Sequence, residues 1–420
     1  MSKLLNRIRE GLRDMCYIWA QEMRATVTDE GVIIFFILVP LLYPLLYSWA
    51  YSNETVREVP VAVVDLSHSH QSRQFIRQFD ASAETRVAYY CNSLEEARQL
   101  VGKQIVHGVL YFPPDFQILT NRMEQAHVGV YCDMALMLTY KAIFQSVQAV
   151  ASDMNAKIQV ALSGNYTDRD DALTTQPLDF DEVPIFNPTG GYGTFLIPSV
   201  LILIIQQTLL LGIGLSAGTA RETNRYRDLV PVSHHYNGIF RIVFGKALCY
   251  FMIYAILSAY LTIIVPRIFG FTSLLRAGSL LALMVPFILS CIFFGMMLSC
   301  IVRYRENVLL LVVFTSVPFL FLSGLSWPQS NMPGAWRRIA TLLPATFGVR
   351  GFVRLNTMGA SLADIRQEYQ ALWIQTTIYF LATCLVYRFQ ILQARRHAIE
   401  YMEQLKQKRN ETEAKDIPEK

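Results

Sequence analysis

Six long apolar segments interrupt this sequence, and stretches rich in polar residues separate them. They cover residues 32–49, 195–215, 240–265, 280–302, 308–325 and 372–387. A helix needs roughly 20 apolar residues to cross a hydrocarbon core of about 30 Å, and the segments come close to or reach that length. The pattern therefore predicts an α-helical polytopic membrane protein with six transmembrane helices.

The polar stretches predict how the chain is oriented in the membrane. Basic residues are dense before the first apolar segment, between the second and third, between the fourth and fifth, and after the sixth. Because short cytoplasmic loops carry an excess of Lys and Arg, both termini and a loop at 218–240 are predicted to be cytoplasmic. Residues 52–191 and a return segment at 328–369 then face the other side.

The two ends of the chain have different characters. Residues 1–30 show apolar positions at helical spacing with arginines around them, which predicts a cytoplasmic amphipathic helix in the membrane interface. The first span, 31–51, lacks the small-residue pattern of a signal-peptide cleavage site, so we expect it to remain in the protein as a membrane anchor. The charged tail, 391–420, is expected to begin as a helix and to end disordered over 407–420, since that end has too few apolar residues to form a core.

Residues 52–191 have the length of a whole domain. Short apolar runs such as "VAVVD", "TRVAYY", "VHGVLYF" and "HVGVYCD" alternate with helical patterns such as "SRQFIRQF" and "SLEEARQLVGKQ". Alternating strands and helices predict an α/β fold. We therefore expect an α/β extracytoplasmic domain, inserted between the first span and the remaining spans at 192–390.

Composition and motifs argue against an enzyme. With 53% hydrophobic and only 17% charged residues among 420, the chain is too apolar for an ordinary soluble enzyme. The stretch "GIFRIVFGKA" resembles a phosphate loop, but its glycines are spaced too widely and Ala247 replaces the required Ser or Thr. No catalytic residues are assigned, and no cofactor is expected.

Other polar residues allow more than one interpretation. His68 and His70 beside Asp65 favour a polar turn over a zinc site, so no metal is expected. Gln206 and Gln207 lie within a span, where they either line a pathway or bond to a neighbouring helix. Cys91 and Cys132 both fall in the outer domain, where a disulfide is possible in an oxidising compartment.

Several stretches together resemble the ABC-2 type permeases, the membrane subunits of ABC exporters, in the branch with a large outer domain after the first span. They include "QEMRATVTDEGVIIFFILVPLLYPLLY", "VHGVLYFPPDF", "IFNPTGGYGTFLIPSVLILIIQQ" and "LSGLSWPQSNMPGAWRRIATLLPATFGVRGFVR". The positions that match the family are Glu22, Asp29, Pro40, Asn187, Pro188, Phe195, Pro198, Gly324, Pro328, Met332, Pro333, Trp336 and Pro344.

The resemblance implies a function for the polar stretch "TARETNRYRDLVPVSHHYNGIFRIVFGK". In this family the corresponding cytoplasmic loop contacts a separate ATPase. The residues carried over as the coupling contact are Arg221, Glu222, Arg225, Leu229 and Pro231. A permease without a nucleotide site must receive its conformational energy through such a surface.

The resemblance also implies partners and a location. We expect an ABC ATPase subunit, pairing with a second permease chain as a homodimer or heterodimer, and contact with membrane lipid but not nucleic acid. The branch often works with a periplasmic adaptor and an outer-membrane channel, which fits a bacterial inner membrane and multidrug efflux. The alternative is a membrane-anchored receptor or envelope assembly factor whose α/β domain binds a ligand.

Overall fold

The structure is a computed structural model. It describes the chain except residues 1, 123, 165–166, 179–182, 189, 225–227, 232–235, 237, 301, 303 and 416–420, and it describes the backbone alone for 2–8, 398, 405–406 and 408–415. The chain forms two compact units. Unit 1 consists of Met1–Ser52 with Gly191–Lys420, and unit 2 of Asn53–Gly190.

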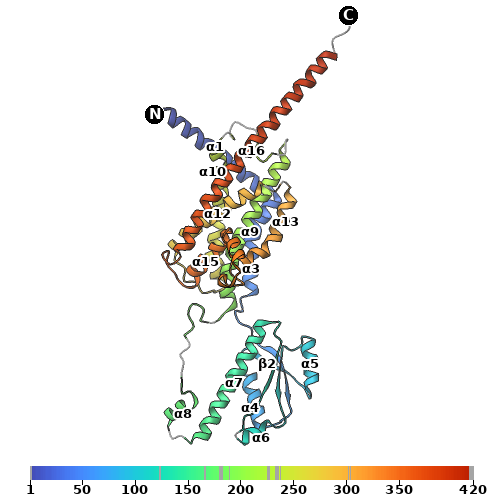
Figure 1. The fold of residues 1–420 in the computed structure, drawn as a ribbon, viewed down its shortest axis with the longest axis vertical. Coiled ribbons are helices and arrows are strands. Elements are labelled where there is room, and N and C mark those ends of the chain that lie inside the picture. The colour runs from blue at the N-terminus through green and yellow to red at the C-terminus, as the bar shows by residue number, and fades with distance from the viewer. Residues whose placement is uncertain are drawn as a thin grey trace. The chain divides into compact units, whose positions relative to one another are not determined.

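Unit 1 is built from helices, which Figure 1 shows as a bundle around α9. In chain order they are α1 (Ser2–Thr28), α2 (Glu30–Ile33), the π-helical turn η1 (Ile34–Leu38), α3 (Val39–Ala50), α9 (Tyr192–Thr223), α10 (Ile239–Ala259), the π-helical turn η3 (Tyr260–Ile264), α11 (Val265–Ile268), α12 (Ala277–Ser299), α13 (Arg305–Leu322), the 3₁₀ turn η4 (Gln329–Asn331), α14 (Gly334–Ala340), α15 (Pro344–Thr357) and α16 (Arg366–Lys415).

Five helical segments among the described residues are long and apolar enough to cross a membrane. They are Glu30–Ala50, Tyr192–Thr223, Ile239–Ile268, Ala277–Ser299 and Arg305–Leu322. The predicted sixth span, 372–387, lies within α16 and is less apolar because it includes one glutamine and several threonines. The helical membrane fold with an inserted α/β region is thus confirmed.

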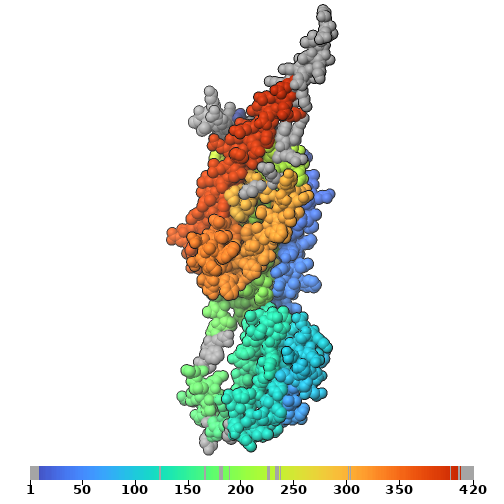
Figure 2. Space-filling model, turned by 45° about the vertical axis from the view of Figure 1, so that its right-hand side comes forward, coloured from blue at the N-terminus to red at the C-terminus, as the bar shows by residue number. Residues whose placement is uncertain are grey.

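Helix α9 is the centre of unit 1, and α13 lies at its surface. In the most apolar 18-residue segment of α9, 89% of the residues are buried, against 17% in the corresponding segment of α13. Figure 2 shows α13 in light orange along the visible face. Two glycines let neighbours approach α9: a Cβ at Gly212 would overlap the ring of Phe36, and one at Gly214 would overlap Val308. Small residues of this kind allow close helix packing in membranes.

Unit 2 is an α/β fold with a four-stranded sheet in the order β2-β1-β3-β4. Strand β1 pairs in parallel with β2 and β3, and β4 pairs antiparallel to β3. Its elements are β1 (Val59–Asp65), α4 (His70–Asp80), β2 (Thr85–Tyr90), α5 (Leu94–Gly102), β3 (Gly108–Phe112), α6 (Phe116–Asn121), β4 (Gly129–Cys132), α7 (Met137–Ser163) and α8 (Asp168–Thr175).

Both faces of the sheet in unit 2 are covered. In β1, Val61 and Val63 pack into the core formed with α4 and α7, while Ala62 and Val64 pack into the core on the α5 side. Figure 1 shows α4 and α7 on one side of the strands and α5 on the other. Because successive side chains of a strand point to opposite faces, the continuous apolar run of β1 is what a doubly covered strand requires.

One expectation from the sequence is wrong, and one possibility that the sequence left open is excluded. The tail remains helical through Lys415 instead of becoming disordered at 407, because residues 407–415 contain neither proline nor glycine and include good helix formers such as Glu, Lys and Ala. The rest of that prediction, 416–420, lies outside the described residues. Cys91 and Cys132 are free thiols. They lie at opposite edges of the sheet and against opposite cores, farther apart than the roughly 7 Å of Cα separation that a disulfide can span.

Candidate functional site

Helix α1 packs against the rest of unit 1 through one line of residues spaced four apart. Asp14, Ile18, Glu22 and Thr26 are buried, whereas Leu12 is 54% exposed. Residues at positions i and i+4 of a helix lie on the same face. The inward face of α1 therefore carries two carboxylates, and each of them requires a partner because a buried unpaired charge is costly.

Helix α10 supplies a cation to each of these carboxylates. Arg241 pairs with Asp14, and Lys246 Nζ lies 2.6 Å from Glu22 Oε2. Glu22 Oε1 also accepts hydrogen bonds from Ser216 Oγ, at 2.9 Å, and from the Tyr250 hydroxyl. Burial opposes the ionisation of Glu22, but the charge of Lys246 and these hydrogen bonds outweigh it and lower the pKa of the carboxyl.

The Gly-Lys pair at 245–246 has a structural role here. A Cβ at Gly245 would lie 3.0 Å from both the Ile18 Cβ and the Met15 carbonyl oxygen, so the glycine permits close contact between α1 and α10. Lys246 then reaches Glu22. Sequence reasoning considered this pair as part of a phosphate loop and Lys246 as the end of the polar stretch 219–246. The signal that could have revealed the contact is the spacing of Asp14 and Glu22 on one face of α1.

Asp29 connects three further elements at the same end of unit 1. Its Oδ1 accepts the backbone N–H groups of Gly31 and Val32 at the start of α2. Thr219 Oγ1 and Arg305 Nη2 each donate to its carboxylate at 2.6 Å, from α9 and α13. Burial raises the pKa of Asp29, but these hydrogen bonds outweigh that effect and the pKa is lowered.

The polar stretch after Thr219 is also tied into the bundle. Arg221 is buried and donates to the Cys300 carbonyl oxygen at 2.9 Å and to that of Val302. A cation is favourable there because the last carbonyl groups of a helix, in this case α12, are unsatisfied. The buried Asp228 carboxylate lies 3.1 Å from His397 Nδ1 in α16.

The structure places the predicted coupling residues in two groups. Arg221 and Leu229 are buried and hold the stretch against the bundle, while Glu222 and Pro231 are exposed on its surface. Arg225 lies outside the described residues. Of the described members of the set, only Glu222 and Pro231 are on the surface in this structure and available to a partner.

A cavity of about 590 Å³ opens beside this surface. Its walls come from α1, α2, α9, the connection between α9 and α10, and α10 itself. The residues that line it include Gln21, Glu22, Asp29, Ser216, Thr219, Asn224, Leu229, Pro231, Tyr236 and Lys246. Because the charges of Glu22, Asp29 and Lys246 already have partners, the cavity is suited to receive a protruding protein segment more than a strongly charged ligand.

The two intramembrane glutamines have different surroundings. Gln206 is buried, and its Oε1 accepts the backbone N–H of Ala345 at 2.6 Å. This contact satisfies one of the free N–H groups at the start of α15. The side-chain amide of Gln207 is buried without a hydrogen bond to any described residue. Gln206 Nε2 is likewise buried without a hydrogen bond to any described residue, so the choice between pathway and packing stays open for both glutamines.

Taken together, the apolar helical bundle, the inserted α/β unit and the internally paired loop are features of a transporter's membrane subunit. Residues 31–385 match the family described as ABC-2 family transporter protein, and the chain belongs to this family. It is a multi-pass membrane protein, and permeases of this family normally lack an ATPase domain and imply a partner ATPase.

Curated relatives are similar over most of the chain. The chain is 23% identical over 319 residues to the probable multidrug ABC transporter permease YbhR of Escherichia coli strain K12, covering 74% of this chain and 81% of the relative. The YbhR of Escherichia coli O157:H7 matches with the same identity and coverage. Membership in the permease family favours transport over the alternative of a receptor or assembly factor.

Proposed function

We propose that this permease is the membrane subunit of an ATP-driven exporter, and that a separate ATPase drives it through the exposed surface of the polar stretch 219–246, which runs from the end of α9 into the start of α10. The observation that supports this most is the division of polar residues in that stretch. Arg221, Asp228, Arg241 and Lys246 bind within unit 1. Glu222 and Pro231 are instead exposed, and Pro231 lines the cavity.

This arrangement suits the transfer of a movement from a partner into the membrane. Glu222 is part of the last turn of α9, the central helix of unit 1, so a displacement at Glu222 acts directly on the core of the bundle. The ion pairs to α1 and the bonds from Arg221 connect the same end to α1 and α12. A partner changes the equilibrium only if it binds two conformations with different affinity, and a surface tied to several helices provides such a difference.

The orientation in this proposal follows from the distribution of charge, and the further partners follow from the resemblance to the family. Both termini and the stretch 218–240 would be cytoplasmic, with unit 2 and the segment 328–369 on the opposite side of a bacterial inner membrane. Two permease chains would form one pathway, above two ATPase subunits, with a periplasmic adaptor and outer-membrane channel as further partners. The name of the relative supports small-molecule drugs as the class of substrate.

The test is retention of the ATPase on the purified permease together with export from vesicles. We expect Glu222→Lys to lose both. In the complex this carboxylate would be buried in an ion pair, and removing one partner of such a pair costs about 2 to 5 kcal/mol of binding free energy. The matched control is Glu403→Lys, which makes the same change of charge at an exposed position of α16.

The control should retain the ATPase and export normally. A substitution at a solvated surface position changes the stability of the fold by under about 0.5 kcal/mol, and Glu403 is outside the proposed contact. If Glu222→Lys also binds the ATPase and exports normally, the surface of this stretch is not the coupling contact. Loss of both activities in the two variants alike would point to a general effect of charge.

A further inference from the structure

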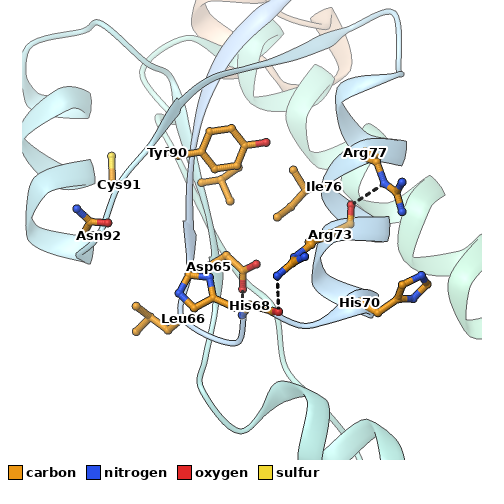
Figure 3. Close-up of a pocket in the computed structure, with 11 residues that line it drawn as sticks. Asp65, Leu66, His68, His70, Arg73, Ile76, Arg77, Tyr90, Cys91 and Asn92 are labelled. Atoms are coloured by element: carbon orange, nitrogen blue, oxygen red, sulfur yellow. Dashed lines mark hydrogen bonds between the residues drawn. The ribbon is translucent and has the colours of Figure 1, made fainter.

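Unit 2 contains a cleft of its own, at the ends of two parallel strands. It has a volume of about 820 Å³ and lies where β1 and β2 end and α4 begins (Figure 3). Open α/β sheets generally bind ligands outside the carboxyl ends of their strands, and ligand sites usually have volumes of roughly 300 to 1,000 Å³. Position and size therefore both mark this cleft as a candidate binding site.

The cleft carries an excess of positive charge. Arg73 and Arg77 border it from successive turns of α4, and neither forms an ion pair with a described residue. The carboxylate of Asp65 is already occupied, since it accepts hydrogen bonds from the backbone N–H groups of Ser67 and His68 and from Ser72 Oγ at 2.8 Å. The guanidinium groups are thus available to an external anion.

The loop between β1 and α4 is held in one conformation. His68 has a φ of 51°, in the left-handed region that residues other than glycine seldom adopt. Asp65 stabilises this turn through the His68 N–H, and Arg73 Nη2 donates to the His68 carbonyl oxygen at 3.1 Å. Strained backbone of this kind is concentrated at functional sites, and the contact with His68 fixes the position of the Arg73 side chain.

The wall of the cleft opposite α4 carries an aromatic ring. Tyr90 ends the edge strand β2 and is 71% exposed. In Figure 3 its ring and the side chain of Ile76 point toward each other across the cleft. Such a wall suits a flat apolar group, because aromatic rings stack favourably in offset or edge-to-face arrangements.

We propose that unit 2 binds an organic anion with a planar aromatic body at this cleft. The acidic group of the ligand is held by Arg73 and Arg77, since guanidinium groups bind carboxylates through paired hydrogen bonds. The aromatic body packs on Tyr90. This assignment goes beyond the permease function, because it gives unit 2 a ligand-binding activity that energy coupling at Glu222 does not require.

The test uses the full chain in phosphatidylcholine nanodiscs and observes a fluorinated probe by ¹⁹F NMR relaxation. The probe is 4-(trifluoromethyl)benzoate, and its neutral counterpart is 4-(trifluoromethyl)benzyl alcohol. We expect the benzoate to bind the wild-type chain and the alcohol to bind at least tenfold more weakly. The double variant Arg73→Gln/Arg77→Gln should weaken benzoate binding about 10- to 100-fold, as expected for the loss of hydrogen bonds between charged groups.

The matched control is Arg98→Gln/Arg122→Gln, which removes the same charge from exposed positions of unit 2 outside the cleft. This control should bind the benzoate as the wild type does. Equal weakening in both double variants, or equal binding of benzoate and alcohol, would overturn the proposal, because general electrostatics or the lipid would then account for the signal.

Two further variants keep the test informative. Arg77→Gln alone preserves the contact between Arg73 and His68, so it replaces the double variant if the latter does not fold. Tyr90→Leu should weaken binding of the benzoate and leave any binding of trifluoroacetate, which has no ring, unchanged. Undiminished benzoate binding in both variants would contradict the site.

Discussion

The buried pair of Glu22 and Lys246 provides a quantitative test of how α1 is attached to the bundle. Both side chains are 7% exposed, and their charged atoms lie 2.6 Å apart. Glu22→Gln leaves the ammonium group buried without its carboxylate, and Lys246→Met leaves the carboxylate without its ammonium group. Breaking a buried pair from one side costs about 3 to 5 kcal/mol of unfolding free energy, and we expect each single variant to lose stability in this range.

The double variant Glu22→Gln/Lys246→Met should be more stable than either single variant. Replacing a whole buried pair by neutral groups of similar size is often neutral or stabilising, and the glutamine can still bind Ser216 and Tyr250 through its amide. The coupling energy between the two positions should therefore exceed about 3 kcal/mol, because a double variant that costs less than either single variant leaves at least one single cost of about 3 to 5 kcal/mol as coupling.

The assay is reversible unfolding of the full chain in mixed micelles, combined with hydrogen exchange across 15–27 of α1. Glu10→Gln is the control, because it makes the same chemical change at an exposed position of α1 and should alter stability by under about 0.5 kcal/mol. The single variants should also exchange faster in α1. Additive effects of the two substitutions, with a coupling energy near zero, would refute the argument that this pair holds α1 in place.

The same pair predicts how stability depends on pH. The pKa of Glu22 is lower in the folded chain than its ordinary value of about 4.3. Its contribution to stability is therefore complete above that ordinary value and is lost as the pH falls through the folded pKa. Wild-type unfolding free energy should decrease over this acidic window, and the decrease should be smaller in Glu22→Gln.

Three further predictions concern the membrane topology, the independent folding of unit 2 and the helix packing inside unit 1. A reporter fused after Asp133 should report the outer face and one fused after Lys406 the cytoplasm, and reversed signals would contradict the orientation drawn from the basic residues. Unit 2 expressed alone should be soluble, with a mixed α/β circular dichroism spectrum and a cooperative melt; a random-coil spectrum would show that it depends on the rest of the chain. Gly212→Ala should destabilise the full chain by about 1 to 3 kcal/mol by overlap with Phe36. The control Gly278→Ala, which meets open space, should not do so in the same unfolding assay.

Much of the fold could be predicted because its causes are local in sequence. The apolar runs that became α9, α10 and α12 are continuous, so their length alone indicates membrane helices. In unit 2 the strands and helices alternate at a spacing that hydrophobic patterning detects. The sixth span was harder to delimit, because α16 continues from Arg366 to Lys415 as one helix and changes from apolar to charged without a helix-breaking residue.

The contacts of the candidate site could not be predicted in the same way, because they join residues far apart in the chain. Glu22 and Lys246 are separated by 224 positions, and no periodicity links them. Arg221 shows the same limit. Its sequence neighbourhood indicates a surface charge, yet it is buried against the carbonyl groups at the end of α12. This interaction depends on how α12 is placed beside α9, which the sequence around Arg221 does not show.

These contacts also explain why so polar a stretch follows the apolar helix α9. Helix α1 brings the carboxylates of Asp14 and Glu22 to the bundle, and carboxylates buried without cations would be unstable there. Arg241 and Lys246 neutralise them. Most of the charge in the stretch therefore serves the folding of this end of unit 1, and the coupling proposal depends on Glu222, which is exposed and can contact a partner without breaking an internal ion pair of the described residues.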